Sequence, residues 1–239
     1  MKIKSNIVNY SNIINRLEEI IKKELKADVT GHDRYHSERV LNLARFIAKH
    51  EKANIQIIEI AAILHDLNDW KFKSEKNRPK ISVRELLHQL HLPAEIINSV
   101  CDIIDSISFK GSKVKDNAES IEAKIVQDAD RLDALGAIGI ARAFAYGGYK
   151  NRKIYDPDIK PVYHKSFKEY KSSQSHTINH FYEKLLLLKD RLHTKTAKKI
   201  AAKRHKFLVA FLNQFLGEWN LFGEKAAKKD KKTKNILKF

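Results

Sequence analysis

Residues 55–67 read Ile-Gln-Ile-Ile-Glu-Ile-Ala-Ala-Ile-Leu-His-Asp-Leu, and this stretch decides the fold. Its side chains are nearly all apolar, which is typical of a helix buried on every side. We therefore expect a central helix that leads into the pair His65-Asp66. On both sides of it, apolar residues recur at helical spacing and predict further helices. These span residues 7–25, 40–48, 83–90, 93–107, 118–135, 136–145, 175–192 and 194–219.

The composition agrees with an all-α fold. Only 8 Gly and 4 Pro occur in 239 residues, too few for the turns of a β-sandwich, a barrel or a Rossmann sheet. The single cysteine, Cys101, excludes a disulfide framework. We find no stretch apolar enough to span a bilayer and no signal peptide after Met1. We expect a cytoplasmic protein without a membrane partner.

The chain shows no internal repeat and no linker, which predicts one domain over residues 1–222. Gly147-Gly148 interrupts the helical pattern, so residues 147–172 are expected to form a long loop of the kind that covers binding sites. Residues 223–239 are Lys-rich and are expected to form a disordered tail.

The charge balance leaves two explanations open. The chain has 46 Lys and Arg against 29 Asp and Glu, a net charge of +17. Such an excess can reflect an anionic partner such as nucleic acid. Because Lys greatly outnumbers Arg, an AT-rich genome is the favoured explanation, and a sequence-specific reader of DNA would use more Arg.

Four side chains carry candidate metal chemistry. His65 and Asp66 follow a buried helix, and burying an imidazole and a carboxylate without partners is costly. A divalent cation bound to both removes this cost. His36, near the start of the second helix, and Asp130, on a later helix, supply two further ligands. This set of nitrogen and oxygen donors suits Mn, Ni, Fe, Co or Mg better than a closed structural zinc site.

The order His36, His65-Asp66, Asp130 resembles the H…HD…D signature of the HD superfamily of metal-dependent phosphohydrolases. The match continues in three blocks, residues 62–67, 125–142 and 180–185. These blocks resemble one bacterial subfamily, which includes enzymes that hydrolyse nucleotides, and the resemblance extends over residues 10–222. It implies a single all-helical, HD-type domain with the metal at its centre. It also implies that a metal-activated water cleaves a phosphoester or phosphoanhydride.

One divalent metal ion per chain is expected. Two-metal HD proteins add His ligands between the HD pair and the last Asp, and this interval here offers only His88 and His91. Both lie at the end of an amphipathic helix, where they can simply be solvated. The GYP motif of the cyclic-dinucleotide phosphodiesterases is absent too, because Lys150 follows Gly148-Tyr149.

Two side chains near the ligands are candidates for catalysis. Asp69, three residues after Asp66, can act as a general acid or base, or can pair with a nearby lysine. His32 can orient His36 or hydrogen-bond a water at the metal, and it can equally cap the helix.

Three further acids are expected to have structural roles. Asp33 lies at the expected helix start, where it suits the N-cap. Asp133 is expected to hold Arg131 or Arg142 in place. Asp128 diverges from the metal ligand two residues later, because two residues turn a helix by about 200°.

A phosphate substrate needs cations to bind it. The blocks of closest resemblance contain several candidates for this role: Arg142, Lys184, His180, Lys124 and Arg204. Three tyrosines of the glycine-rich region, Tyr146, Tyr149 and Tyr155, can stack on a base or can pack the loop.

The sequence therefore predicts a metal-dependent phosphohydrolase that acts on a nucleotide or another small phosphorylated substrate, as a monomer or homodimer. The products can be phosphate or pyrophosphate. The alternative is a basic nucleic-acid-binding protein or an RNA phosphodiesterase on an HD scaffold. The complete ligand set favours the enzyme, since a pure binding module has no use for it. A stringent-response hydrolase resembles the chain less, because such enzymes carry acids in series where this chain has Leu67-Asn68-Asp69.

Overall fold

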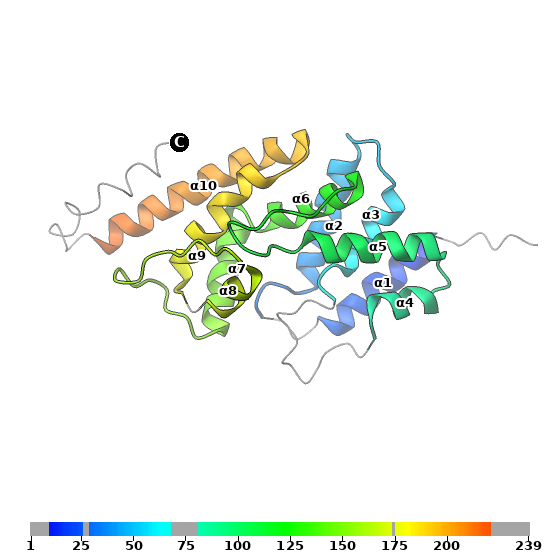
Figure 1. The fold of residues 1–239 in the computed structure, drawn as a ribbon, viewed down its shortest axis with the longest axis horizontal. Coiled ribbons are helices and arrows are strands. Elements are labelled where there is room, and N and C mark those ends of the chain that lie inside the picture. The colour runs from blue at the N-terminus through cyan, green and yellow to red at the C-terminus, as the bar shows by residue number, and fades with distance from the viewer. Residues whose placement is uncertain (1–9, 26–28, 68–80, 174, 221–239) are drawn as a thin grey trace, which may run out of the picture.

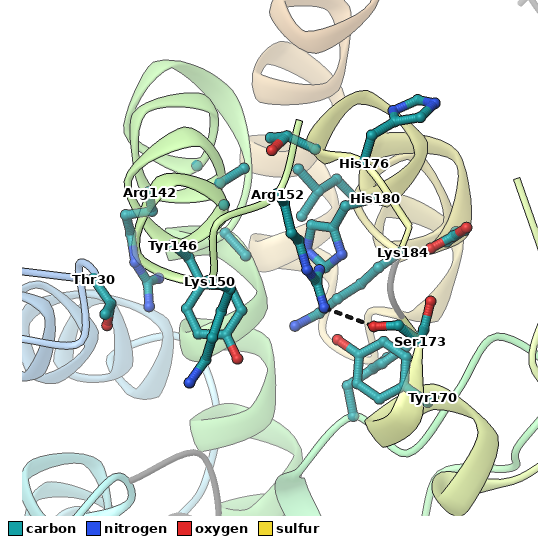
Figure 2. Close-up of a pocket in the computed structure, with 18 of the residues that line it drawn as sticks. Thr30, Arg142, Tyr146, Lys150, Arg152, Tyr170, Ser173, His176, His180 and Lys184 are labelled. Atoms are coloured by element: carbon teal, nitrogen blue, oxygen red, sulfur yellow. Dashed lines mark hydrogen bonds between the residues drawn. The ribbon is translucent and has the colours of Figure 1, made fainter. Parts of the chain in front are cut away.

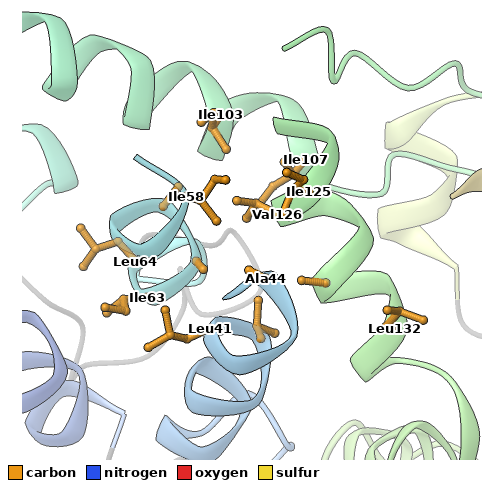
Figure 3. Close-up of a cluster of buried hydrophobic side chains, with 14 of the residues drawn as sticks. Leu41, Ala44, Ile58, Ile63, Leu64, Ile103, Ile107, Ile125, Val126 and Leu132 are labelled. Atoms are coloured by element: carbon orange, nitrogen blue, oxygen red, sulfur yellow. The ribbon is translucent and has the colours of Figure 1, made fainter. Parts of the chain in front are cut away.

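Helix α3 (Ile55–Leu64) lies at the centre of the group of helices that forms one end of the molecule, and it is largely buried, as its sequence predicts. The Asn54 side chain begins it by accepting hydrogen bonds from the backbone N–H groups of Gln56 and Ile57. Its apolar side chains from Ile58 onward are buried and pack between residues of three other helices (Figure 3). Those residues are Leu41, Ala44, Ile103, Ile107, Ile125, Val126 and Leu132.

The computed structural model describes residues 10–25, 29–67, 81–173 and 175–220. The other helices are α1 (Tyr10–Glu24), α2 (Arg34–Ala48), α4 (Val83–Gln89), α5 (Ala94–Ile107), α6 (Ile121–Asp133), α7 (Gly136–Tyr149), α8 (Phe167–Ser172), α9 (Thr177–Glu183), the 3₁₀ helix η2 (Leu185–Arg191) and α10 (Lys195–Trp219). No strand occurs in these residues, which confirms the all-α prediction. Helices α1 to α5 gather at one end of the molecule and α7 to α10 at the other, with α6 between them (Figure 1).

The glycine pair does not end α7. This helix continues to Tyr149, so the predicted break at Gly147-Gly148 is wrong. Gly147 serves packing instead, because a β-carbon on it would lie 2.1 Å from Oγ1 of Thr177, the first residue of α9. The glycine thus lets α7 and α9 approach closely. The predicted loop begins only after the helix and includes the short helix α8.

The predicted helix over 175–192 is divided at Lys184, whose φ of −139° and ψ of −63° separate α9 from η2. The helix predicted over 194–219 is confirmed as α10, with Thr194 as its N-cap. Asp128 holds this helix start: its carboxylate accepts hydrogen bonds from the Thr194 backbone N–H and hydroxyl at 2.8 Å each, and from His193 N at 2.9 Å. Asp128 therefore ties α6 to α10.

The tail expected over 223–239 and the basic segment 71–80 lie outside the described residues. Among the helices that the structure describes, none combines the length and the apolar character needed to cross a membrane.

The two glycines provide a test of the α7–α9 packing. Gly147→Ala is expected to lower the free energy of unfolding by about 1–3 kcal/mol, because Thr177 or its helix must move. Gly148→Ala is the matched control, since a β-carbon there meets no atom within 4 Å. The control should be neutral or more stable by up to about 1 kcal/mol, from helix propensity. Urea unfolding of both variants measures the difference, and equal effects would contradict the packing role.

Candidate metal centre and its cavity

Four side chains from three helical regions converge in the core; we call them the His/Asp cluster (His36, His65, Asp66 and Asp130). His36 lies in the first turn of α2, His65 and Asp66 directly follow α3, and Asp130 lies on α6. The Nε2 atoms of His36 and His65 are 3.1 Å apart. His36 Nε2 lies 3.2 Å from Asp66 Oδ2 and 3.5 Å from Asp130 Oδ1. The structure thus brings together the four residues that the sequence predicts as ligands.

The hydrogen bonds of the two imidazoles determine where their protons lie. His36 Nδ1 lies 2.7 Å from the carboxylate of Asp133, and His65 Nδ1 lies 2.9 Å from the carbonyl oxygen of Ala62. Both partners accept hydrogen bonds, so each Nδ1 carries the proton and each neutral ring presents a lone pair at Nε2. Two buried lone pairs that face each other repel, and a cation removes the repulsion. The cluster therefore fits a divalent metal ion.

The pKa values of the cluster residues depart from their usual range. Burial raises the pKa of Asp66, but His65 and His32 lower it more, so this pKa lies well below its usual range. Burial likewise raises the pKa of Asp130, and the neighbouring His65 and His36 outweigh that effect, so it also lies below its usual range. Burial and Arg142 lower the pKa of His36, whereas its hydrogen bonds to carboxylates raise it further, above the usual value. The two carboxylates are therefore held in their ionised form, and the carboxylates around His36 stabilise positive charge at its ring.

Asp133 holds the cluster in place. Its carboxylate accepts hydrogen bonds from His36 Nδ1, from Arg39 at 2.7 and 3.1 Å, and from Arg142 Nη1 at 2.8 Å. It therefore joins α2, α6 and α7 through charged hydrogen bonds. Of the two partners that the sequence left open for Asp133, the structure selects Arg142, while Arg131 pairs with Asp116 at 2.6 Å.

His32 and Asp33 precede α2 and have different roles. Asp33 is the N-cap, because its side chain accepts a hydrogen bond from the His36 backbone N–H at 2.9 Å. His32 Nδ1 lies 2.8 Å from Asp66 Oδ2 and 3.2 Å from Arg142 Nη2. His32 thus contacts the cluster through Asp66 rather than through His36, and it is close enough to His36 and Asp66 for all three to ligate one ion. Its catalytic role stays a prediction.

A cavity of about 860 Å³ opens beside the cluster. Asp130, whose side chain is 33% exposed, lines it together with His32. Two walls face each other in Figure 2: Arg142 and Tyr146 lie on α7, Tyr170 and Ser173 lie opposite, and Arg152 and Lys184 extend between them. Most charged side chains around the cavity are cations: Arg131, Arg142, Lys150, Arg152, Lys153, Lys171 and Lys184.

The predicted substrate residues do not all reach this cavity. Arg142, Lys184 and His180 line it. Arg204 does not, because its guanidinium donates to the Leu132 carbonyl at the end of α6 and its stem packs on Gly136. Lys124 does not line it either, and its charge acts on His193 near the start of α10. We therefore exclude Arg204 and Lys124 from the candidate substrate site. Asp69 lies outside the described residues.

Of the three tyrosines considered as possible stacking residues, only one lines the cavity. Tyr146 lines the cavity, with the Arg152 guanidinium 5.8 Å from its ring centre. Tyr155 instead packs against Phe215 and Trp219 near the end of α10. Tyr149 remains exposed at the end of α7.

Sequence reasoning missed several residues of the site. Lys150 and Arg152 follow the glycine pair, inside the segment predicted to cover a binding site, and this basic run was the available signal. Arg152 Nη2 also donates to the Ser173 carbonyl at 2.9 Å across the cavity mouth (Figure 2). Glu183 lies in the resemblance block 180–185, which was the available signal, whereas Tyr170 had no distinguishing pattern, because only the packing of α8 brings it to the cavity.

Comparison with known proteins identifies the class. The HD domain family model matches residues 34–135, which include all four residues of the His/Asp cluster. An HD-superfamily hydrolase of known structure from Bacillus thuringiensis is 40% identical, with a TM-score of 0.65 over 89% of this chain and 99% of that chain. A protein from Lactobacillus plantarum is 38% identical, with a TM-score of 0.78 over 92% of this chain and 100% of that chain. The chain belongs to the HD-domain family, and it is a hydrolase.

The chain is also similar to YpgQ of Bacillus subtilis. It is 40% identical over 194 residues, which cover 80% of this chain and 85% of YpgQ. A crystal structure of YpgQ in complex with ADP superposes with a TM-score of 0.69 over 87% of this chain and 95% of that chain.

Removal of the Asp133 charge tests how the cluster is supported. Asp133→Asn is expected to weaken metal binding about 10–100-fold, because His36 loses the partner that fixes its proton on Nδ1. Asp116→Asn is the control, since Asp116 binds Arg131 and Arg191 away from the cluster. The control should lower thermal stability and leave metal affinity unchanged. Titration of the chelator-treated proteins with Mn²⁺ measures the metal affinity of both variants. Equal loss of affinity in the two variants would argue against the orienting role of Asp133.

Proposed function

We propose that the protein is a metal-dependent phosphohydrolase that cleaves a nucleotide. One observation carries the proposal: the His/Asp cluster opens through Asp130 into a cavity lined mostly by cations. A donor set for a divalent metal beside a cationic cavity suits a substrate that presents a phosphate to the metal. The cavity volume of about 860 Å³ is in the range of small-molecule and cofactor sites.

His36, His65, Asp66 and Asp130 would hold one divalent metal ion per chain. When bound, the metal supplies a Lewis acid for a phosphoryl oxygen and lowers the pKa of water. The protein contributes orientation. Asp133 keeps the His36 proton on Nδ1, and the Ala62 carbonyl does the same for His65, so both Nε2 atoms stay available.

The substrate side of the site consists of cations on both walls. Arg142 lies on α7, where Asp133 and His32 restrain its guanidinium, and Lys184 reaches in from the end of α9. The positive charge of Lys184 also lowers the pKa of Asp130, after the larger effects of burial and of the two histidines. Lys184 and Asp130 line the same cavity, so a phosphate at the cluster can meet both of them. The ADP bound to YpgQ supports a nucleotide as the ligand class.

Loss of a ligand is expected to abolish metal binding and hydrolysis together. His65→Ala should bind no metal, measured by metal analysis of the purified protein, and should release no phosphate or pyrophosphate from any nucleotide. A panel of nucleotides with Mn, Co, Ni and Mg, after chelator treatment, provides the assay. His88→Ala is the matched control, because His88 is exposed on α4. Full metal content and activity in His65→Ala would overturn the proposal.

Lys184 provides a separate test of the substrate side. Lys184→Ala is expected to lower kcat/KM for nucleotides by about one to two decades, since a charged hydrogen bond in a partly desolvated site is lost. Lys124→Ala removes the same charge outside the cavity and should change only salt-dependent steering. Kinetics at low and high salt separate the two effects. If kcat/KM falls equally in both variants, and high salt erases the difference from wild type, Lys184 does not bind substrate.

A further inference from the structure

The wall opposite α7 differs in chemistry from the rest of the cavity. Tyr170 of α8 lines it and faces the wall that carries Arg142 and Tyr146 (Figure 2). Its ring packs edge-to-face against Phe109 at 5.3 Å and against His164 at 5.9 Å. The ring is therefore fixed in orientation, and it offers an aromatic surface to the cavity.

Glu183, at the end of α9, is the only carboxylate apart from Asp130 among the described residues that line the cavity. The residue is only 3% exposed. Its Oε1 accepts a hydrogen bond from the Val162 backbone N–H at 3.0 Å. Its Oε2 lies 3.9 Å from His164 Nε2, which is beyond hydrogen-bond distance. His164 Nε2 is itself a buried atom without a hydrogen-bond partner in the described part of the chain.

A buried carboxylate imposes a constraint on any ligand. It repels phosphate groups, and it accepts hydrogen bonds from donors. Arg142 lies on the α7 wall and contacts His32 next to the cluster, so a phosphate bound at the cluster lies on that side of the cavity, opposite Tyr170. The uncharged part of the ligand then lies towards Tyr170 and Glu183. A nucleoside has the required chemistry, because its base stacks on an aromatic ring and its amino or hydroxyl groups donate hydrogen bonds.

We infer that Tyr170 and Glu183 form the nucleoside end of the cavity, and that Glu183 determines specificity by accepting a hydrogen bond from a donor on the nucleoside. This inference rests on the proposal that the substrate is a nucleotide. The donor is the base amino group or a ribose hydroxyl. Discrimination of this kind is large when a site holds a buried polar group, because a ligand without the matching donor leaves that group unpaired.

The test uses Glu183→Gln in the full-length protein. Glutamine can keep the acceptor for Val162 N–H, while the second oxygen is replaced by an NH₂ group that donates. Dissociation constants are measured for ATP, ITP, 2′-dATP, 3′-dATP and tripolyphosphate. ITP replaces the base amino group with an oxygen, and the two deoxy compounds each lack one hydroxyl. Glu119→Gln, on the exposed surface, is the control.

The wild-type protein is expected to bind ATP at least about tenfold more tightly than it binds the analogue that lacks the donor. In Glu183→Gln this ratio should vanish, and for ITP it should reverse, whereas the affinity for tripolyphosphate should stay unchanged. If the substitution changes the affinity ratio only for ITP, the donor is the base amino group. If it changes the ratio only for one deoxy analogue, the donor is the hydroxyl that this analogue lacks.

Two results would overturn the inference, and they differ. If wild type and Glu183→Gln bind the nucleotides with identical ratios, Glu183 does not contact the nucleoside, and the proposed function is unaffected. If wild type binds tripolyphosphate but no nucleotide, the inference and the nucleotide substrate both fail.

Discussion

Two buried imidazoles, His36 and His65, face each other through nitrogen atoms that carry no proton when the rings are neutral. Their Nδ1 atoms are committed to Asp133 and to the Ala62 carbonyl, so the repulsion between the Nε2 lone pairs cannot be relieved by a change of tautomer. Positive charge between them, from a metal ion or from a proton on one Nε2, relieves it. This constraint explains why two carboxylates lie next to them in the core of an otherwise apolar group of helices.

Asp133 extends this constraint from the His/Asp cluster to the cavity. The same carboxylate that orients His36 also holds Arg142, and Arg142 contacts His32, which in turn contacts Asp66. The His/Asp cluster and one cationic wall of the cavity are therefore parts of a single hydrogen-bonded network. A change in any member alters its neighbours, so substitutions here are not expected to be additive.

The second half of the molecule supplies the opposite wall. Gly147 allows α7 and α9 to approach, and the end of α9 brings Lys184 and Glu183 to the cavity. These adjacent residues have opposite charge, and the turn between α9 and η2 brings both to the cavity. The cavity thereby combines many cationic side chains with the aromatic rings of Tyr146 and Tyr170 and the buried carboxylate of Glu183.

The sequence by itself determined most of the helices and the four side chains that converge as the His/Asp cluster. The apolar run before His65-Asp66 predicted a buried central helix, because local hydrophobic spacing is sufficient for that prediction, and the H…HD…D order predicted which four side chains converge. The tertiary structure decided the partners. Whether Gly147 breaks a helix or packs one, whether Arg204 binds substrate or the Leu132 carbonyl, and whether Glu183 is on the surface or in the cavity depend on residues far along the chain. Spacing within one helix reports which residues share a face, and only the packing of helices decides what that face meets.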